Sequence, residues 1–333
     1  MNRSLKAAWI AFSMLFVVAF NASAQTPKTL KFTKEGKFKI VQFTDVHFKY
    51  KNPASDIALE RINEVLEAEK PNLVIFTGDV IYAPPADTAM RVVLQQVANH
   101  KIPYVVTFGN HDDEHNMSRR QLYDVIRTVP YNLMPEYIDT FDFVLPLQAS
   151  DSKQDAALLY CLDSNSYAQP KEIGGYGWFS FNQVNWYLNQ SKQYTEKNNN
   201  TPLPALAFFH IPVPEYNEAM TQDNVIMVGK KMERECSPKI NTGIFAAMRL
   251  SGDVMGIFVG HDHDNDYAVM WKDVLLAYGR YSGGNTVYNN IPNGARVIEM
   301  YEGTRTFKSW IRQANNEIVY PVTYPDSFRK KKD

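Results

Sequence analysis

The chain of 333 residues has very little cysteine, because Cys161 and Cys236 are the only two. Two cysteines make neither a disulfide framework nor a thiolate-rich structural metal site. In an exported chain they would either pair or remain two buried thiols, and the sequence leaves both possibilities open. We assign neither cysteine a catalytic role.

Charge of one sign is also lacking. The chain has 35 Lys and Arg against 36 Asp and Glu, a formal net charge of -1. Without a basic field to attract phosphate backbones, no nucleic-acid partner is expected. The composition, 45% hydrophobic and 21% charged, is that of an ordinary globular protein that can bury a large core.

Long hydrophobic runs are absent except at the N-terminus. There Arg3 and Lys6 precede an apolar run over 7–20, and "ASA" stands before Gln25. This order is typical of a secretory signal peptide, and the run is shorter than the roughly 20 residues of a spanning helix. We predict a cleaved signal peptide over 1–24, a secreted or periplasmic mature protein and no membrane span after cleavage. The alternative is a retained membrane anchor.

Strand-like and helix-like segments alternate in the first third of the chain. Strands are expected at 37–44, 72–79 and 102–112, with helices over 56–69 and 87–100 between them. This βαβαβ order predicts a largely parallel sheet.

Further strands are expected at 155–165 and 204–212, around a helix over 181–194. From Gly256 onward consecutive strands, including one over 266–280, predict an antiparallel second half. No repeat or linker divides the chain, so residues 25–333 are expected to form a single α/β domain of two packed sheets with outer helices.

Five stretches share one pattern, an apolar strand followed by polar side chains that can bind metal. They are "VQFTDVHF", "VIFTGDVIY", "VVTFGNHDDE", "AFFHIP" and "IFVGHDHD". Because ligands bind at the carboxyl ends of strands in open α/β sheets, these side chains are expected to gather at one edge. Five of the seven histidines lie in these stretches, more than ordinary structural roles explain: His47, His111, His210, His261 and His263.

The spacing of these residues also indicates metal binding. Asp45 and His47 are two apart, as are His261 and His263. Residues i and i+2 of an extended chain point to one side. Asp, Asn and His ligands suit Zn, Fe or Mn, and there are enough of them for two ions with Asp79 as a bridge. Two ions about 3.5–4 Å apart can hold a hydroxide and clamp both oxygens of an in-line displacement at phosphorus.

The motifs "DVH", "GDVIY", "GNHD", the His of "FFHIP" and "GHDH" resemble those of the calcineurin-like metallophosphoesterases, in the same order. The resemblance extends from Lys37 to Arg312. The stretches "LDSNSY", "GYGWFSFNQVNWY" and "GRYSGG" are more loosely similar to the purple-acid-phosphatase-like branch. The resemblance implies a four-layer αββα sandwich of two mixed sheets flanked by helices.

The resemblance also implies roles for individual residues. It implies one metal ion held by Asp45, His47, Asp79 and His263. It implies a second ion held by Asp79, Asn110, His210 and His261. His111 would then face the phosphate and assist the leaving group, and Asp112 would orient His111 from outside the metal shell.

The function that follows is hydrolysis of small-molecule or protein phosphate esters by in-line attack of a metal-bridging hydroxide. Monoesters and diesters remain equally open. The alternative is a catalytically inactive binding or scaffold member of the same fold. Loss of metal ligands would indicate that alternative, and the sequence shows no such loss.

One departure from the purple acid phosphatases concerns His47 and Tyr82. Those enzymes have Gly at the position of His47 and use the Tyr of GDxxY as a ligand to ferric iron. This chain has both residues, and two strong ligands are not expected to share one coordination position. We therefore predict that His47 is the ligand, that Tyr82 lies near the site or in the core, and that the protein is not purple.

Further charged residues follow the last motif. Asp262 is expected to point away from the metals, while Asp264 and Asp266 are interpreted as solvated loop charges rather than acceptors for ligand imidazoles. The predicted crevice is lined by Tyr278, Arg280, Tyr281 and Asn285. Arg280 would either pair with phosphate oxygens or be structural.

Overall fold

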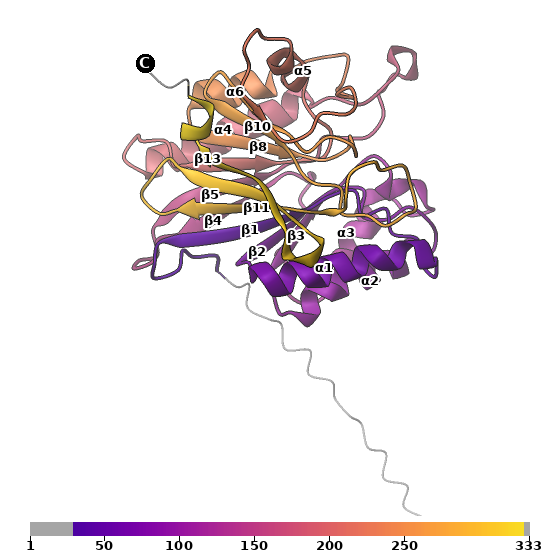
Figure 1. Ribbon diagram of the computed structural model, residues 1–333. Helices are drawn as coiled ribbons and strands as arrows, with labels where there is room; N and C mark the ends of the chain where they lie inside the picture. Colours follow the sequence, from indigo (N-terminus) through magenta and orange to yellow (C-terminus); the bar gives the residue numbers. More distant parts are fainter. Residues whose placement is uncertain (1–28, 330–333) are drawn as a thin grey trace, which may run out of the picture.

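Two β-sheets pack face to face between layers of helices in the computed structural model, which describes residues 29–329 (Figure 1). The predicted signal peptide lies outside the described residues. Within them, no helix is both long enough and apolar enough to span a bilayer.

The first sheet has six strands in the order β13–β12–β11–β1–β2–β3. Their bounds are β1 (Lys37–Phe43), β2 (Leu73–Thr77), β3 (Tyr104–Thr107), β11 (Gly294–Tyr301), β12 (Phe307–Gln313) and β13 (Ile318–Tyr324). The strands β1, β2 and β3 are parallel, and β11 pairs antiparallel with β1. The predicted parallel βαβαβ unit is therefore confirmed.

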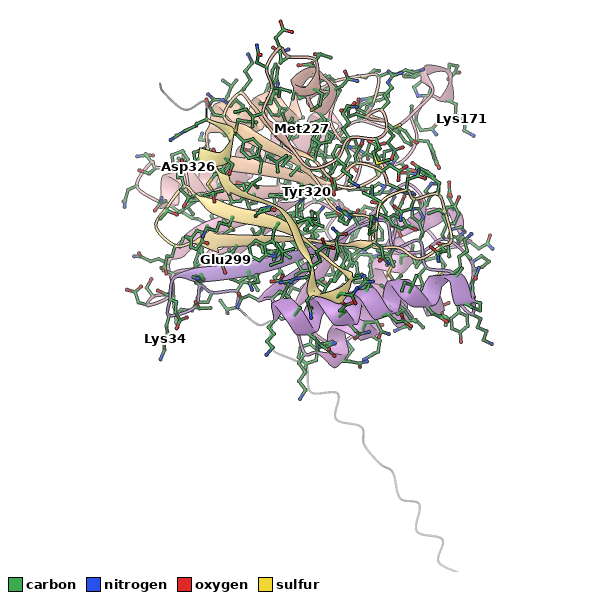
Figure 2. The ribbon with its side chains drawn as sticks, viewed as in Figure 1. Lys34, Lys171, Met227, Glu299, Tyr320 and Asp326 are labelled. Atoms are coloured by element: carbon green, nitrogen blue, oxygen red, sulfur yellow. The ribbon has the colours of Figure 1, made fainter. Side chains whose placement is uncertain are left out.

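The second sheet has seven strands in the order β4–β5–β6–β8–β10–β9–β7. Their bounds are β4 (Phe143–Gln148), β5 (Asp155–Cys161), β6 (Ala205–Phe208), β7 (Met227–Val228), β8 (Val254–Val259), β9 (Ala268–Trp271) and β10 (Val274–Tyr278). The strands β5, β6, β8 and β10 are parallel. Met227 marks the short edge strand (Figure 2).

Helices cover the outer faces of both sheets (Figure 1). On the first sheet lie α1 (Asp56–Glu69), α2 (Ala86–Asn99) and α3 (Arg119–Thr128). On the second lie α4 (Phe181–Lys197), α5 (Glu215–Met220) and α6 (Ile244–Ser251). The helix α1 buries Ile62, Val65 and Leu66, the apolar face that its sequence spacing predicts. The layers confirm the α/β sandwich of two mixed sheets flanked by helices.

Aromatic side chains fill the space between the sheets. The ring of Phe258 in β8 lies 5.2 Å from Phe208 in the same sheet and 5.9 Å from Phe307 of the other sheet. All three side chains are fully buried. Burial of such apolar area is the main stabilising contribution to a sandwich of this kind, and it fixes how the two sheets face each other.

The second half differs from its prediction in two ways. The single strand expected over 266–280 is two antiparallel strands, β9 and β10, because Lys272 and Asp273 form a left-handed turn with φ of 47° and 65°. The strand β8 is parallel to β6 and β10, so the antiparallel part begins only at β9. A two-residue turn inside one apolar run leaves the hydrophobic pattern almost unchanged, which is why the sequence did not indicate it.

Candidate dinuclear metal site

The five polar stretches follow strands of both sheets. Asp45, Asp79 and Asn110 follow β1, β2 and β3 of the first sheet, whereas His210 and His261 follow β6 and β8 of the second. The backbone N–H of His261 donates to Asp45 Oδ2 at 3.0 Å, which ties the two sheets together at this edge. The polar side chains therefore gather at strand ends as predicted, but these strand ends belong to two sheets rather than to one.

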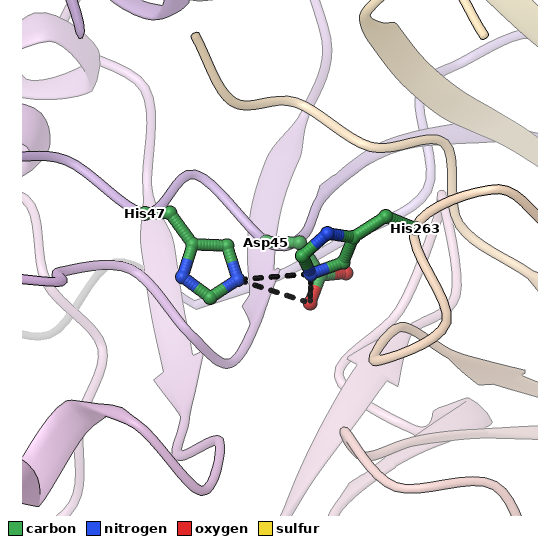
Figure 3. A group of neighbouring side chains, drawn as sticks. All are labelled: Asp45, His47 and His263. Atoms are coloured by element: carbon green, nitrogen blue, oxygen red, sulfur yellow. Dashed lines mark hydrogen bonds and ion pairs between the residues drawn. The ribbon is translucent and has the colours of Figure 1, made fainter. Parts of the chain in front are cut away.

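Asp45, His47 and His263 form one group of potential metal ligands (Figure 3). Asp45 Oδ1 lies 3.9 Å from His47 Nε2 and 3.7 Å from His263 Nε2. The two Nε2 atoms are 3.0 Å apart. All three side chains are buried, so the group forms a compact set of donors shielded from solvent.

Asp79, His210 and His261 form the second group. Asp79 Oδ2 lies 3.1 Å from His210 Nε2, which is 3.3 Å from His261 Nδ1. The same carboxylate oxygen is 3.6 Å from Nε2 of His47 in the first group. The two groups are therefore adjacent, with Asp79 between them, and together they fit a dinuclear metal centre.

The hydrogen bonds around the cluster test whether cations fit there. His210 Nδ1 donates to the carbonyl of Thr77 at 2.7 Å, and His263 Nδ1 donates to the carbonyl of Tyr288 at 2.9 Å. In neutral rings this leaves the Nε2 lone pairs directed at the cluster, where His210 faces a carboxylate. Asn110 Oδ1 is buried without a hydrogen-bond partner. Imidazole nitrogens and carboxylates that converge in this way, together with a buried amide oxygen that has no other partner, suit borderline or hard cations such as Zn, Fe or Mn.

The protonation states agree with metal binding. Burial holds the pKa of His47 and of His261 well below the ordinary value, so both rings are neutral. Burial alone would raise the pKa of Asp79, but the facing His210 holds it well below its ordinary value. Neutral imidazole and ionised carboxylate are the forms that bind metal ions. Burial alone would lower the pKa of His210, but the facing carboxylates of Asp79 and Asp45 raise it to about 9. The ring therefore holds a proton beside these carboxylates, and a bound cation would balance their charge in place of that proton.

The loops that carry the ligands have strained backbones. Four of the potential ligand residues have positive φ angles: Asp45 (54°), His47 (45°), Asp79 (52°) and His261 (81°). Such conformations are costly for residues other than glycine and persist where the surrounding structure holds them. A Cβ on Gly109 would stand 2.1 Å from Asp79 Oδ1, so only glycine allows the backbone to approach the Asp79 side chain this closely.

Asp112 does not contact the His111 ring as predicted. Its carboxylate accepts backbone hydrogen bonds from Asp79 at 2.9 Å and from Gly109 at 2.8 Å, so it fastens two ligand loops together. The ring of His111 instead contacts Glu114, whose Oε2 lies 2.6 Å from Nδ1. Residues 112–114 form a single 3-10 turn, which carries Glu114 back to His111. An acidic residue three positions after His111 is the sequence feature that would have indicated this contact.

A second residue missed in the sequence is Tyr167. Its hydroxyl donates to Glu114 Oε1 at 2.7 Å and accepts from Asn110 Nδ2 at 3.3 Å. Because the amide nitrogen of Asn110 is thus occupied, its oxygen is left for the cluster. A continuous chain of hydrogen bonds therefore runs from His111 through Glu114 and Tyr167 to Asn110.

Asp262 points away from the cluster, in agreement with the sequence analysis. It accepts hydrogen bonds from the Tyr278 hydroxyl at 2.6 Å and from the backbone N–H of Cys236 at 3.1 Å. Cys161 and Cys236 are both free thiols, and of the two only Cys161 is buried, whereas Cys236 is half-buried.

The interpretation of Asp264 and Asp266 as solvated charges was wrong. Both are buried. Asp264 accepts from the backbone of Asn290 at 2.5 Å, and Asp266 pairs with Arg280. Arg280 also donates to the carbonyl of Pro292 at 2.6 Å and is fully buried, so the structural alternative holds for it. Buried carboxylates need such partners, and the partners come from loops distant in sequence.

A cavity of about 360 Å³ lies over the cluster and is lined by His47, Tyr82, His111, His263, Thr286, Val287 and Tyr288. Of the lining predicted from sequence, Tyr278 and Tyr281 are buried and Asn285 is exposed, and the neighbouring segment 286–288 forms the wall instead. The Tyr82 ring lies 4.9 Å from the His47 ring, so it is near the site but belongs to neither ligand group.

Comparison with known proteins adds independent information. The family model described as calcineurin-like phosphoesterase matches residues 38–265. "Probable inactive purple acid phosphatase 29" of Arabidopsis thaliana is 32% identical over 306 residues, covering 81% of this chain and 78% of that protein. "Phosphatase DCR2" of Saccharomyces cerevisiae is 32% identical over 310 residues, covering 82% of this chain and 52% of that protein.

A solved structure, a dimetal phosphatase from Danio rerio, superposes with a TM-score of 0.60 at 14% identity, covering 86% of this chain and 98% of that one. At this identity the likeness shows the fold alone. The family match and the relatives at 32% identity go further. The chain belongs to the calcineurin-like phosphoesterase family, in its purple-acid-phosphatase-like branch.

Proposed function

We propose that the protein hydrolyses phosphate esters at the two adjacent ligand groups. Asp45, His47 and His263 would hold one cation, and Asn110, His210 and His261 the other, with Asp79 bridging. The observation that carries this proposal is the position of Asp79 Oδ2, 3.1 Å from His210 Nε2 and 3.6 Å from His47 Nε2. One carboxylate oxygen within reach of both groups is what a bridging ligand requires.

Two cations bound there would supply Lewis acidity and a water of lowered pKa for in-line attack at phosphorus. The protein supplies position and a proton. His111 lines the cavity, and its Nδ1 contacts Glu114. That contact leaves Nε2 to give a proton to the leaving oxygen, which is general-acid assistance. Asp112 acts indirectly, by fixing the loops of Asp79 and Asn110.

A catalytically inactive binding or scaffold protein is the second candidate function. It is favoured by the names of two relatives, "Probable inactive purple acid phosphatase 29" and "Probable inactive purple acid phosphatase 14" of Arabidopsis thaliana. Against it stands the complete proposed ligand set of this chain, together with His111.

Metal analysis of the purified mature protein, combined with assays on phosphomonoesters, phosphodiesters and phosphoproteins, tests the proposal. We expect two metal ions per chain and turnover of at least one ester class. Asp79→Ala should lose both metal and activity, whereas His111→Ala should keep the metal and lose most turnover. Bound metal without hydrolysis of any ester would favour the scaffold alternative.

We further propose that residues 1–24 direct export and are removed, and that residues 25–333 form one domain in a secreted or periplasmic protein. The order of charged, apolar and small residues supports this. N-terminal sequencing of the protein from the exported fraction should begin at Gln25. Recovery of the full-length chain in a membrane fraction would support the anchor alternative.

A further inference from the structure

Four tyrosines surround the ligand cluster, and we call them the tyrosine collar: Tyr82 after β2, Tyr167 and Tyr176 between β5 and α4, and Tyr288 between β10 and β11. Each ring lies against a different imidazole. The distances between ring centroids are 4.9 Å for Tyr82–His47, 6.5 Å for Tyr167–His111, 4.2 Å for Tyr176–His261 and 4.5 Å for Tyr288–His263. Packing of these four histidines alone does not need a tyrosine on each of them, so the collar calls for another explanation.

Two collar members, Tyr82 and Tyr288, also line the cavity over the cluster. Tyr288 is stacked on His263 yet remains 56% exposed, so much of this large ring faces open space. Tyr82 stands edge-on to both His47 and His111, at 4.9 Å from each. The cavity therefore has an aromatic ring beside each of the two histidines of the first ligand group, His47 and His263, and Tyr82 also borders His111.

The two rings are held in place by the protein itself. The Tyr288 hydroxyl donates to Glu233 Oε2 at 3.0 Å. The Lys49 amino group lies 4.8 Å from the centre of the Tyr82 ring and donates to the carbonyl of Thr286 at 3.2 Å. Aromatic walls fixed before binding lose little side-chain entropy when a ligand enters, and their faces and edges can pack against a flat ring.

The charges around the cavity restrict the ligand further. Among the residues that the structure describes, no Lys or Arg belongs to the cavity lining, and the Lys49 amino group, which stands over the Tyr82 ring, already donates to the Thr286 carbonyl. Glu114 and Glu233, in contrast, hold two of the collar tyrosines. A ligand with additional anionic groups beyond the reacting phosphate would meet the carboxylates of Glu114 and Glu233, and of these Glu114 already pairs with His111.

We infer that the site takes small phosphate esters whose group next to the phosphate is flat, aromatic and free of further negative charge. The inference rests on the proposed function for the phosphate end of the ligand, and on the collar for the other end. Stacked and edge-to-face contacts between aromatic rings are favourable beyond the area that they bury.

Binding of two phosphonates, which cannot be hydrolysed, tests the inference. Isothermal titration calorimetry on the Zn²⁺-saturated protein compares phenylphosphonate with methylphosphonate. We expect phenylphosphonate to bind at least about tenfold more tightly, the scale of an aromatic contact with its buried area. In the double variant Tyr82→Ala, Tyr288→Ala the preference should fall below about threefold, with methylphosphonate affinity unchanged.

Tyr301→Ala is the matched control, because Tyr301 pairs with Lys37 at the start of β1, the end of the strand away from Asp45. It should keep the full preference. Equal affinity for the two phosphonates, binding of neither, or an unchanged preference in the double variant overturns the inference.

The titration, read together with the ester assays that test the proposed function, separates this inference from that function. A protein that prefers phenylphosphonate but hydrolyses no ester would contradict hydrolysis and retain the collar as a binding site. An active esterase without that preference would support hydrolysis and contradict the collar as a binding site.

Discussion

Glu114 Oε2 lies 2.6 Å from Nδ1 of His111, and Glu114 Oε1 accepts a hydrogen bond from the Tyr167 hydroxyl at 2.7 Å. One carboxylate on a short turn therefore orients the proposed proton donor and, through Tyr167, the Asn110 amide. Glu114 is a positioning residue, since it lies behind both groups rather than in the cavity lining.

We expect Glu114→Ala to lower kcat about 10- to 100-fold, the usual loss when a partner of an active-site imidazole or metal ligand is removed. KM and metal content should change little, because His111 would lose its orientation but not its place. Glu114→Gln should recover part of the rate, since an amide oxygen still accepts from Nδ1. Steady-state kinetics with metal analysis gives the measurement.

Glu60→Ala provides the control for Glu114, because Glu60 is an exposed acid on α1. Equal losses in the alanine and glutamine variants together with loss of metal would show that Glu114 only supports the loop.

Gly109→Ala should abolish metal binding. A Cβ there would stand 2.1 Å from Asp79 Oδ1 and 2.4 Å from Asp79 N, and the backbone atom cannot move aside cheaply. Gly252→Ala is the control, since Gly252 has φ of 74° with nothing within 4 Å of an added Cβ. It should cost about 1 kcal/mol of stability and keep its metal. Metal content and thermal unfolding are measured for both, and full metal occupancy in Gly109→Ala would contradict the expectation.

The iron-loaded protein should show no intense visible absorption, because His47, and not Tyr82, is the expected ligand. His47 Nε2 lies 3.6 Å from Asp79 Oδ2, whereas the Tyr82 ring packs edge-on against the His47 ring. Tyr82→Phe should accordingly retain metal, and His47→Ala should lose it. A strong visible band that disappears in Tyr82→Phe would reverse the assignment.

Asp142→Asn should become progressively more stabilising as pH rises. Burial raises the pKa of Asp142 to about 6 from its ordinary 3.8. Between these values the unfolded chain loses this proton while the folded protein keeps it, so the group destabilises the fold as pH increases. The amide removes that effect and can still accept from the backbone N–H of Asp163, now 2.8 Å from Oδ1.

Denaturant unfolding of wild type and Asp142→Asn at about pH 4 and about pH 8 measures this. The difference in unfolding free energy should shift in favour of the variant by at most about 3 kcal/mol, from ~1.4 kcal/mol per pKa unit. Asp151→Asn, at an exposed position, should show no such shift. A difference independent of pH would contradict the assignment to Asp142.

Local pattern was enough to predict several parts of the molecule. The helix Asp56–Glu69 and the parallel strands β1, β2 and β3 follow from apolar spacing. The clustering of His, Asp and Asn after strands predicted the ligand groups, because a strand's direction decides at which edge its end lies. The family resemblance supplied the four layers and the division into two metal ions.

Other features depended on contacts between residues far apart in sequence. In the sequence, Asp264 and Asp266 cannot be told from solvated loop acids. They are buried because Asn290 and Arg280 lie beside them in the folded protein and pair with their carboxylates. Asp112 and Glu114 are two acids two residues apart, and the backbone of the 3-10 turn decides which one contacts His111. The sequence by itself determined which residues can bind metal and where strands deliver them. The tertiary structure decided which partner each remaining charge has, because hydrogen bonds act over about 3 Å and that proximity arises only when the two sheets pack together.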